Sequence, residues 1–434
     1  MLDIKFIREN KKEIARAAKN KNIKIDLDKL LEVDDRRRGM ANEIANLRMK
    51  RNKQANELKK SQPTKEQIEQ GKNYKEQIAK LENEMEEISI LYETLLYQVP
   101  NVVSGDTPIG ADESGNKVIK TVGEIPKYNF KPKNHLELGV AHNIIDTEKS
   151  SLISGSRFNY LFGEAVFLQF ALIQFVFETL TDQKIISCLA KKAGDPFDKP
   201  FRLVLPPVMA KSAVMKKMDR FDPIEDRYYF KEDDMLLIGS AEHTLGPLHL
   251  NEIIKEEDLP IRYIGYSTAF RREAGSYGKD TSGILRRHQF DKLEMESFIQ
   301  PQYGLVEQNF IVTIQEYLVS KLDIPYRVVI KCAGDIGGKA DFRAIDIECY
   351  MPGQGIYRET HTSDYMTDFQ ARRLNTKYKK TGGGNEFVHM NDATAFAIGR
   401  ILIAILENHQ QADGSIKIPE VLQKYMPGGL RVIK

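Results

Sequence analysis

Cations and acids gather at the two ends of a polar loop in the middle of the chain. Arg271 and Glu273 lie just before the loop, and Glu294 lies a few residues beyond it. The basic residues that directly follow the loop are Arg286, Arg287 and His288. Guanidinium groups bind phosphate oxygens in pairs, and carboxylates bind an ammonium or a hydroxyl group. The pattern suits a triphosphate and an amine bound together, with a charged surface hairpin as the alternative.

The segment that carries these residues reads as a β-hairpin. Residues 268–296 consist of an entering run, a loop at 275–283 (GSYGKDTSG) rich in turn-forming residues, and a returning run with Phe290, Leu293 and Met295. Strands with hairpins and few βαβ units indicate an antiparallel sheet flanked by helices, an α+β domain. We expect further strands at 201–210, 235–240, 327–331, 344–351 and 355–359, and helices at 164–183, 306–322 and 391–407. Pro206 and Pro207 confine the strand at 201–210 to an edge.

The first hundred residues have a different, helical pattern. Residues 2–19 predict a short amphipathic helix and residues 28–60 a long one. After a break at 61–64, a second long helix has apolar residues spaced by four and three. They are Tyr74, Ile78, Leu81, Met85, Ile88, Tyr92 and Leu95. This seam predicts an antiparallel coiled-coil arm at about 28–97 within a helical domain of residues 1–100. A linker at 101–133 and a catalytic domain at 134–434 follow.

The charge on the arm is uneven. Basic residues such as Arg48, Arg51 and Lys53 outnumber acids toward the tip, while acids such as Glu84 and Glu87 gather at the root. A basic outer half favours contact with an RNA backbone, because neutralised phosphates drive such binding. A solvated coiled-coil surface without a partner is the alternative.

The bulk composition excludes several classes of protein. The 434 residues are 41% hydrophobic and 29% charged, with a net charge of +2, so any nucleic-acid surface must be local. The three cysteines form no C-x-x-C pair, so we expect no zinc site and no disulfide framework, and a cytoplasmic location fits. The charged start is not a secretory signal, and no run of about 18 apolar residues predicts a membrane span.

Common nucleotide-binding and hydrolase motifs are absent. Neither a P-loop, a G-x-G-x-x-G after a strand, H-E-x-x-H nor G-x-S-x-G occurs. A different arrangement could still hold ATP, with arginines on the phosphates, an aromatic ring on the adenine and acids on magnesium.

Several segments in order along the whole chain resemble the seryl-tRNA synthetases, a family of class II aminoacyl-tRNA synthetases. Residues 271–275 (RREAG) with 288–292 (HQFDK) and 294–295 resemble motif 2 of that family. The family's later segments, including motif 3, are resembled by residues 369–373 (FQARR), 398–400 (IGR), 407–408 (EN) and 413–415 (DGS). Residues 204–208 resemble the dimer-forming motif 1, and residues 240–242 (SAE) resemble the serine-binding strand. The resemblance implies a homodimer that activates L-serine with ATP and transfers serine to tRNA(Ser). It leaves open whether tRNA(Sec) is also a substrate.

The resemblance also implies roles for single residues. Arg271, Glu359 and Arg400 would be catalytic. The ATP-binding set would be Arg271, Arg272, Glu273, Phe290, Glu359, Thr360, His361, Thr362 and Arg400. The serine-binding set would be Ser240, Ala241, Glu242, Arg271, Glu294 and Thr394. Mg²⁺ would arrive with ATP at Glu359 and Thr362, and the tip of the loop, with Lys279, would meet the tRNA acceptor end.

The chain departs from the family pattern at a few of these sites. Ser240 stands where Thr is typical, and His243 stands where Val is typical. Residues 360–364 read THTSD where the family has a Ser-Ser-Cys-Ser-Asn-like run, and residues 392–395 read DATA where Asn-Gly-Ser-Gly is usual. Asp392 therefore places an extra negative charge near the expected position of the serine amino group.

Two other functions compete with serine–tRNA ligation. A paralogue could pass an activated amino acid to a carrier protein or a small amine, but such relatives tend to lack or remodel the arm. A non-catalytic RNA-binding relative would be expected to lose Arg271, Glu294, Glu359 or Arg400, and all four are present.

Overall fold

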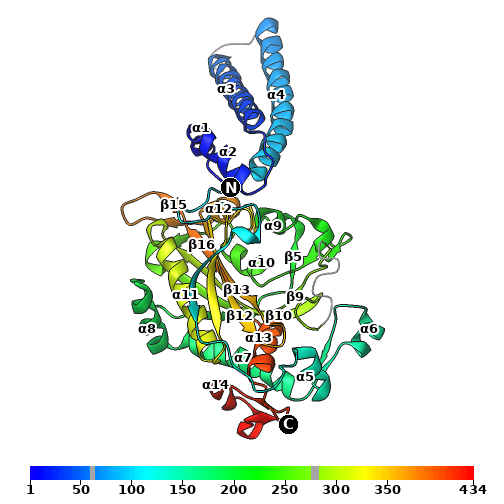
Figure 1. Ribbon diagram of the computed structural model, residues 1–434. Coiled ribbons are helices and arrows are strands. Elements are labelled where there is room, and N and C mark those ends of the chain that lie inside the picture. Colours follow the sequence, from blue (N-terminus) through cyan, green and yellow to red (C-terminus); the bar gives the residue numbers. More distant parts are fainter. Residues whose placement is uncertain (59–63, 275–282) are drawn as a thin grey trace. The chain divides into compact units, whose positions relative to one another are not determined.

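The computed structural model describes residues 1–58, 64–274 and 283–434. Contacts divide the chain into two compact units, residues 1–102 and residues 103–434 (Figure 1). The predicted position of Lys279 at the loop tip falls outside the described residues. Each unit is considered separately below.

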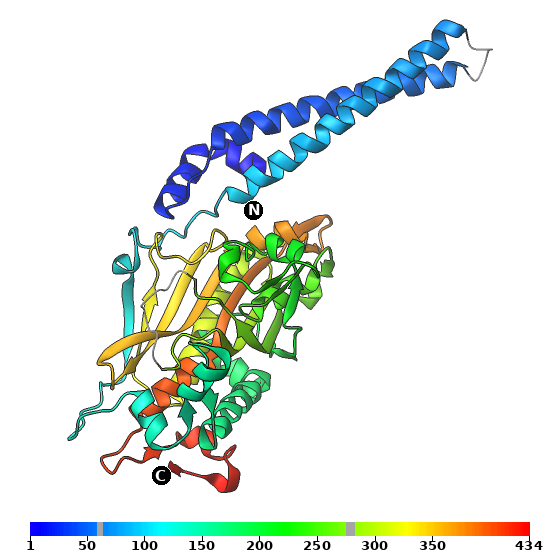
Figure 2. The same ribbon diagram turned by 90° about the vertical axis from the view of Figure 1, so that its right-hand side faces the viewer.

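The first unit is a helical arm. It consists of α1 (Ile4–Glu9), α2 (Lys11–Asn20), α3 (Leu27–Leu58) and α4 (Lys65–Gln98). Two helices replace the one predicted at 2–19, because the backbone leaves the helical region at Asn10. Figure 2 shows α3 and α4 running antiparallel over most of their length, which is about 50 Å at 1.5 Å per residue.

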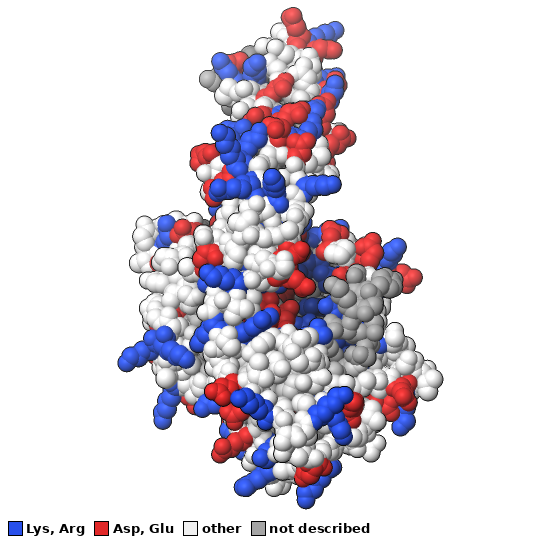
Figure 3. All heavy atoms as spheres, viewed as in Figure 1, with Lys and Arg blue, Asp and Glu red and all other residues white. Residues whose placement is uncertain are grey.

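The predicted apolar seam holds the two long helices together. Val33 and Met40 of α3 are buried against Ile88 of α4, and Leu81 and Met85 pack beside them. Additional apolar contacts come from Ile44, Ile78 and Tyr92. The coiled-coil arm predicted from the spacing is therefore confirmed. On the face seen in Figure 3, basic and acidic side chains lie next to one another along the arm, so this face is of mixed charge.

The second unit is built on an eight-stranded sheet, which confirms the α+β prediction. Its order is β1-β11-β12-β13-β16-β10-β9-β4, and all neighbours are antiparallel except β4 and β9. In that order the strands are Lys117–Val122, Tyr326–Ile330, Arg343–Met351, Ile356–Thr367, His389–Ala397, Gln289–Ile299, Ile261–Phe270 and Arg202–Val204.

The two faces of the sheet differ because side chains alternate along each strand. Leu293, Met295 and Ala393 belong to one buried apolar core. The helices that contribute to this core include α7 (Glu164–Thr181), α8 (Gln183–Ala193), α11 (Gly304–Ser320) and α13 (Ile398–Asn408). The intervening residues Glu294 and Asp392 point to the opposite face, which is polar. The alternation of side chains along the strands therefore places the apolar core on one face of the sheet and the polar residues on the other.

The hairpin predicted at 268–296 is confirmed as β9 and β10. Phe290 pairs with Ala269, and Glu294 pairs with Gly265 on one side and Thr394 of β16 on the other. The register shifts by one residue between Leu293 and Glu294. The central position of β10 therefore fixes the hairpin residues against two neighbouring strands.

Three predicted elements are corrected by the structure. Residues 391–397 lie in β16 instead of a helix, because this segment pairs with β10 and β13 in the middle of the sheet. The predicted strand at 201–210 divides at its two prolines into the edge strand β4 and β5 (Met209–Lys211) of a small separate sheet. Part of the expected linker, β1, is the other edge strand of the main sheet.

Shorter elements surround the main sheet. The helices are α5 (His135–Ala141), α6 (Glu148–Ser154), α9 (Ser212–Lys217), α10 (Glu242–Leu245), α12 (Phe369–Leu374) and α14 (Glu420–Gln423). The strands are β2 (Ile145–Asp146), β3 (Tyr160–Leu161), β6 (Tyr229–Phe230), β7 (Met235–Leu237), β8 (Ile253–Lys255), β14 (Lys377–Lys379), β15 (Asn385–Phe387), β17 (Ile416–Lys417) and β18 (Val432–Ile433).

Helix α7 passes a length and composition test for crossing a membrane, although the sequence predicted no such span. Half of its apolar window is buried inside the protein, and Leu168, Leu172 and Val176 belong to the main core. A core helix of a globular unit gives the same signal, so we assign α7 to the core.

Candidate active site

A cavity opens on the polar face of the sheet where five segments meet. Figure 3 shows acidic and basic side chains around a hollow on this unit. The cavity is lined by both ends of the β9–β10 hairpin, by β13 and β16, and by the first turn of α13. The lining residues are Arg271, Glu273, Ile284, Leu285, Arg286, Arg287, Phe290, Lys292, Glu359, Thr360, Thr362, Thr394, Ala397, Gly399 and Arg400.

The arginines at the outer end of this cavity are held in place by neighbouring groups. Arg271 donates from Nε to the carbonyl oxygen of Gly239 at 3.0 Å, and its guanidinium carbon lies 5.4 Å from the centre of the Phe290 ring. Arg400 donates from Nη1 to Glu359 at 2.8 Å. The open edges of such guanidinium groups are suited to phosphate oxygens.

Glu359 is the acid nearest to these cations. Its partial burial raises the pKa, but the charges of Arg400 and Lys331 outweigh burial and hold the pKa below its usual value. The side chain is 42% exposed, so one face of the carboxylate remains accessible. The hydroxyl groups of Thr362 and Thr394 lie 3.4 Å apart nearby. A carboxylate and hydroxyl oxygens are ligands that suit Mg²⁺.

The inner end of the site is a buried group of carboxylates behind the cavity wall, Glu242, Glu294 and Asp392, none of which lines the cavity itself. Their nearest oxygen atoms all lie within 4.8 Å of one another. Arg220 donates from Nε to Glu242 at 2.7 Å, and Lys292 contacts Glu294 at 2.5 Å. Three acids therefore face two cations, and this spacing allows the acids to share one further cation.

The imbalance leaves some of these carboxylate oxygens without a hydrogen-bond donor, although Nη2 of Arg220 lies 3.7 Å from Oδ2 of Asp392. In the part of the chain that the structure describes, Oε1 of Glu294 and both Oδ atoms of Asp392 accept no hydrogen bond. Burial raises the pKa of Asp392 well above its usual value, and the charge of Glu242 adds to this effect. Burial likewise raises the pKa of Glu294, although Lys292 opposes it. An incoming ammonium group would satisfy these atoms.

Ser240 lies in the inner part of the site, next to Lys292 of the cavity wall. Its hydroxyl donates to Oε2 of Glu294 at 3.2 Å and accepts a hydrogen bond from Nζ of Lys292 at 3.1 Å. Ala241 is fully buried and precedes α10, which begins with Glu242. The segment SAE therefore brings a hydroxyl and a carboxylate to the acid end, while its alanine fills the wall behind them.

The structure brings most of the predicted residues together. Those that line the cavity are Arg271, Glu273, Phe290, Glu359, Thr360, Thr362, Thr394 and Arg400. Two predicted ATP contacts lie elsewhere: the Arg272 guanidinium carbon is 5.7 Å from the Tyr228 ring centre, and His361 packs against Phe396 in the core. His361 also contacts the hydroxyl of Thr360, and burial lowers its pKa to about 3.

Other residues of the site were absent from the predicted set. Lys292 lies two positions before Glu294, so alternation along the strand could have placed it on the same face. Arg286 lines the cavity and donates to Glu273 at 2.6 Å. No sequence signal identifies Arg220, which reaches Glu242 from a loop 22 residues away.

Comparison with known proteins agrees with the family resemblance seen in the sequence. Residues 1–103 match the seryl-tRNA synthetase N-terminal domain, and residues 225–409 match the tRNA synthetase class II core domain (G, H, P, S and T). A serine–tRNA ligase of Dictyoglomus turgidum (strain DSM 6724 / Z-1310) is 40% identical, over 98% of each chain. That of Borreliella burgdorferi (strain ZS7) is 38% identical, over 98% of each chain.

Solved structures agree over the whole length. The structure of seryl-tRNA synthetase from Pyrococcus horikoshii complexed with ATP is 35% identical, with a TM-score of 0.88, over 100% of this chain and 99% of that one. The structure of cytoplasmic serine–tRNA ligase from Naegleria fowleri in complex with AMP is 28% identical, with a TM-score of 0.83 and the same coverage.

The antiparallel sheet and the cavity on its polar face define a class II aminoacyl-tRNA synthetase. With an N-terminal domain of the seryl type and full-length relatives at 40% identity, the chain belongs to the seryl-tRNA synthetase family. Transfer to a carrier protein or a small amine is not favoured, because the full-length relatives with the same N-terminal domain are serine–tRNA ligases.

Proposed function

We propose that the cavity binds ATP at its outer end and L-serine at its acidic inner end, forms seryl-adenylate, and then charges tRNA(Ser). The observation that supports this most directly is that two differently charged regions adjoin at Lys292, which lines the cavity and contacts Glu294. Arginines line the cavity, and among the described residues the buried group behind it has carboxylate oxygens that accept no hydrogen bond.

At the outer end, Arg271 contacts the α-phosphate and the serine carboxylate, and Glu273 contacts the adenine amino group. The adenine lies between the Phe290 ring and the guanidinium of Arg400, an arrangement that the exposed faces of both groups allow. Mg²⁺ would be held by Glu359 and Thr362, where it would neutralise charge on the phosphate oxygens.

At the inner end, Glu242 binds the serine ammonium group and Glu294 binds the serine hydroxyl. Ser240 and Thr394 supply further hydroxyl contacts, and Glu294 and Thr394 occupy paired positions on β10 and β16. A site built to bond the hydroxyl rejects alanine and glycine, because either would leave a buried polar group unpaired.

The reaction needs no covalent bond to the enzyme. The serine carboxylate attacks the α-phosphorus in line, a P–O bond forms, and pyrophosphate leaves with the electron pair of the broken P–O bond. Negative charge builds on the phosphate oxygens, so Arg271 stabilises the transition state more than the ground state. The terminal ribose hydroxyl of the tRNA then attacks the carbonyl carbon and releases AMP.

The arm and a second subunit complete the proposal. The basic residues of the arm bind the tRNA backbone. In the second unit, Phe170 of α7 and Leu205 beside β4 are 57% and 80% exposed, and exposed apolar side chains of this size suit the interface of a homodimer. The protein acts in the cytoplasm.

Amino-acid-dependent exchange of pyrophosphate into ATP tests the reaction. We expect exchange with serine and at least about 100-fold less with alanine, glycine or threonine. The absence of serine-dependent exchange would contradict the proposed function.

Deletion of residues 35–91 tests the arm separately, because it removes most of α3 and α4 and leaves the second unit intact. Exchange should continue while charging of tRNA(Ser) is lost. Charging that survives the deletion would show that the arm does not bind tRNA productively.

A further inference from the structure

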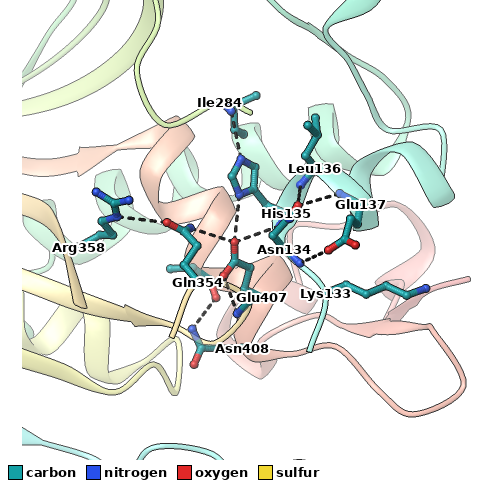
Figure 4. Close-up of polar contacts among 12 residues, drawn as sticks. Lys133, Asn134, His135, Leu136, Glu137, Ile284, Gln354, Arg358, Glu407 and Asn408 are labelled. Atoms are coloured by element: carbon teal, nitrogen blue, oxygen red, sulfur yellow. Dashed lines mark hydrogen bonds and ion pairs between the residues drawn. The ribbon is translucent and has the colours of Figure 1, made fainter. Parts of the chain in front are cut away.

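Glu407, at the end of α13, is fully buried, and its carboxylate receives hydrogen bonds from two separate segments. Its Oε1 accepts from the backbone N–H of His135 at 3.0 Å, from Nδ1 of His135 at 3.0 Å and from Nε2 of Gln354 at 3.1 Å. Its Oε2 accepts from the backbone N–H of Gly353 at 3.0 Å. Figure 4 shows the Glu407 carboxylate between the start of α5 and the turn that joins β12 to β13.

The hydrogen bonds of His135 fix its tautomer. Its Nδ1 faces a carboxylate that accepts only, and its Nε2 receives the backbone N–H of Ile284 at 3.2 Å. The ring must therefore be neutral, with its hydrogen on Nδ1. A doubly protonated ring could not accept the Ile284 hydrogen bond. Glu407 thus sets the orientation and the proton position that allow His135 to hold Ile284.

The return of the hairpin loop lies directly against this ring. A Cβ at Gly283, whose φ is +72°, would lie 2.0 Å from Nε2 of His135. On its other side, the carbonyl oxygen of Ile284 lies 3.1 Å from the position of a Cβ at Gly399 in the first turn of α13. The backbone at 283–284 is therefore held between His135 and α13.

This contact borders the nucleotide end of the proposed site. Ile284, Leu285 and Arg286 all line the cavity, as do Gly399 and Arg400 at the start of the helix that ends with Glu407. The β12–β13 turn held by Glu407 leads along β13 to Glu359. Glu407 and His135 themselves do not line the cavity.

We propose that Glu407 and His135 are positioning residues that hold residues 283–286, α13 and β13 in register for ATP. The proposal rests on the proposed function, because it takes the outer end of the cavity as the ATP site. His135 acts on the nucleotide through the Ile284 backbone, so its loss weakens ATP binding and leaves serine binding unchanged.

Two substitutions of His135 separate its two hydrogen bonds. In His135→Asn, the side-chain NH₂ takes the place of Nδ1 and still donates to Glu407, but nothing reaches Ile284. In His135→Gln, the longer side chain reaches Ile284 with its carbonyl oxygen, and the bond to Glu407 is lost. Because a single hydrogen bond changes a binding constant by about three- to tenfold, we expect His135→Asn to raise the KM for ATP by that factor.

The two variants should have opposite effects: one should change the KM for ATP and the other should change Tm. His135→Asn should raise the KM for ATP with little change in Tm and no change in the KM for serine. His135→Gln should lower Tm and leave the KM for ATP within about twofold of the parent value. A purely structural role predicts instead that the KM for ATP follows the loss of Tm in both variants, and that result would overturn the proposal.

Tyr128→Phe is the matched control, because the Tyr128 hydroxyl donates to the backbone carbonyl oxygen of Asn408 at 2.9 Å, beside Glu407, without touching Ile284. It should leave the KM for ATP unchanged, and an increase equal to that of His135→Asn would also overturn the proposal. If either His135 variant fails to fold, hydrogen exchange of the Ile284 amide in the parent protein tests the proposal instead. An amide protected from exchange supports the hydrogen bond to His135, and an amide that exchanges freely contradicts it. Failure of the proposed function is distinct, because the parent protein would then show no serine-dependent exchange.

Discussion

The two ends of the cavity treat charge in different ways. At the nucleotide end, Arg400 lies 2.8 Å from Glu359 and Arg286 lies 2.6 Å from Glu273, so these cations each have an acid partner. At the serine end, Glu242, Glu294 and Asp392 outnumber the neighbouring cations, and some of their oxygens accept no hydrogen bond from the described residues. One end has more cations than acids, whereas the other has more acids than cations.

This difference follows from what each substrate brings. ATP carries several negative charges together with a metal ion, so arginines paired with acids can exchange part of their contacts for phosphate oxygens. Serine brings a single ammonium group into a dry pocket, and only an excess carboxylate can bind it without losing an existing partner. The acid partners at the outer end therefore hold the arginine side chains in place, while the excess of carboxylates at the inner end strengthens the binding of serine.

Removal of the central cation should have the largest effect. Arg271 faces both substrates in the proposed site, and it has no duplicate at the α-phosphate. Arg271→Ala should lower serine-dependent pyrophosphate exchange at least about 100-fold, the scale observed when a group that stabilises developing charge is lost. Exchange within tenfold of the parent protein would contradict its assignment as the central catalytic residue.

Loss of one carboxylate should affect only the serine end. Glu242→Gln keeps the shape of the side chain but removes the charge proposed to bind the ammonium group. Because a hydrogen bond to a charged group contributes about 1.5–3 kcal/mol, the KM for serine should rise about 10- to 100-fold. The KM for ATP should stay the same, and a parallel rise in both would show that the two ends are not independent.

Asp392 gives a smaller, pH-dependent test of the excess charge. Its pKa in the folded state is raised, by burial first and then by Glu242 and Asp364. Between its unfolded and folded pKa values, the folded protein retains a proton that the unfolded chain has lost. Stability therefore falls as the pH rises above about 4. Asp392→Asn removes this loss, so its gain in stability should be small at pH 4.5 and clearly larger at pH 8.

Urea unfolding at the two pH values measures this difference, because other acids titrate equally in both proteins and cancel. A gain that does not change with pH would show that ionisation of Asp392 does not destabilise the folded protein. In the same variant, the KM for serine should rise only a few-fold, since Glu242 and Glu294 remain.

The sequence predicts the hairpin and much of its chemistry well, and physical reasons limit the rest. Alternation along residues 289–299 and the turn-rich loop indicate β9 and β10, and the resemblance supplies Glu359 and Arg400 from distant segments. The same apolar residues at 391–407 suggested one helix, because the pattern does not show where a buried strand ends and a helix begins. Only the pairing of β16 with both neighbours decides this.

Side chains that reach the site from loops are harder still to predict. Arg220 comes from a loop that pattern analysis does not place, and its role depends on a tertiary contact with Glu242. His361 shows the opposite error: the segment around it lines the cavity, but the register shift on β12 and β13 turns its ring into the core. Local sequence fixes neither outcome.

The smallest predicted effect compares two adjacent arginines at the nucleotide end. Arg286 is paired with Glu273, whereas Arg287 is 5% exposed, and its Nε and Nη2 have no partner among the described residues. Burial lowers the pKa of Arg287 to about 10. Arg287→Met should therefore increase the free energy of unfolding by about 1 kcal/mol, after the loss of its one bond to Phe158.

Arg286→Met is the matched control for this prediction. It removes the hydrogen bond from Arg286 to Glu273 and a cation from the cavity wall, so it should raise the KM for ATP without any gain in stability. Urea unfolding and pyrophosphate-exchange kinetics of both variants distinguish the role of Arg286 from that of Arg287. An equal loss of stability in both variants would mean that the charge of Arg287 is balanced by its surroundings to the same degree as the charge of Arg286. The nucleotide end would then hold no unbalanced charge.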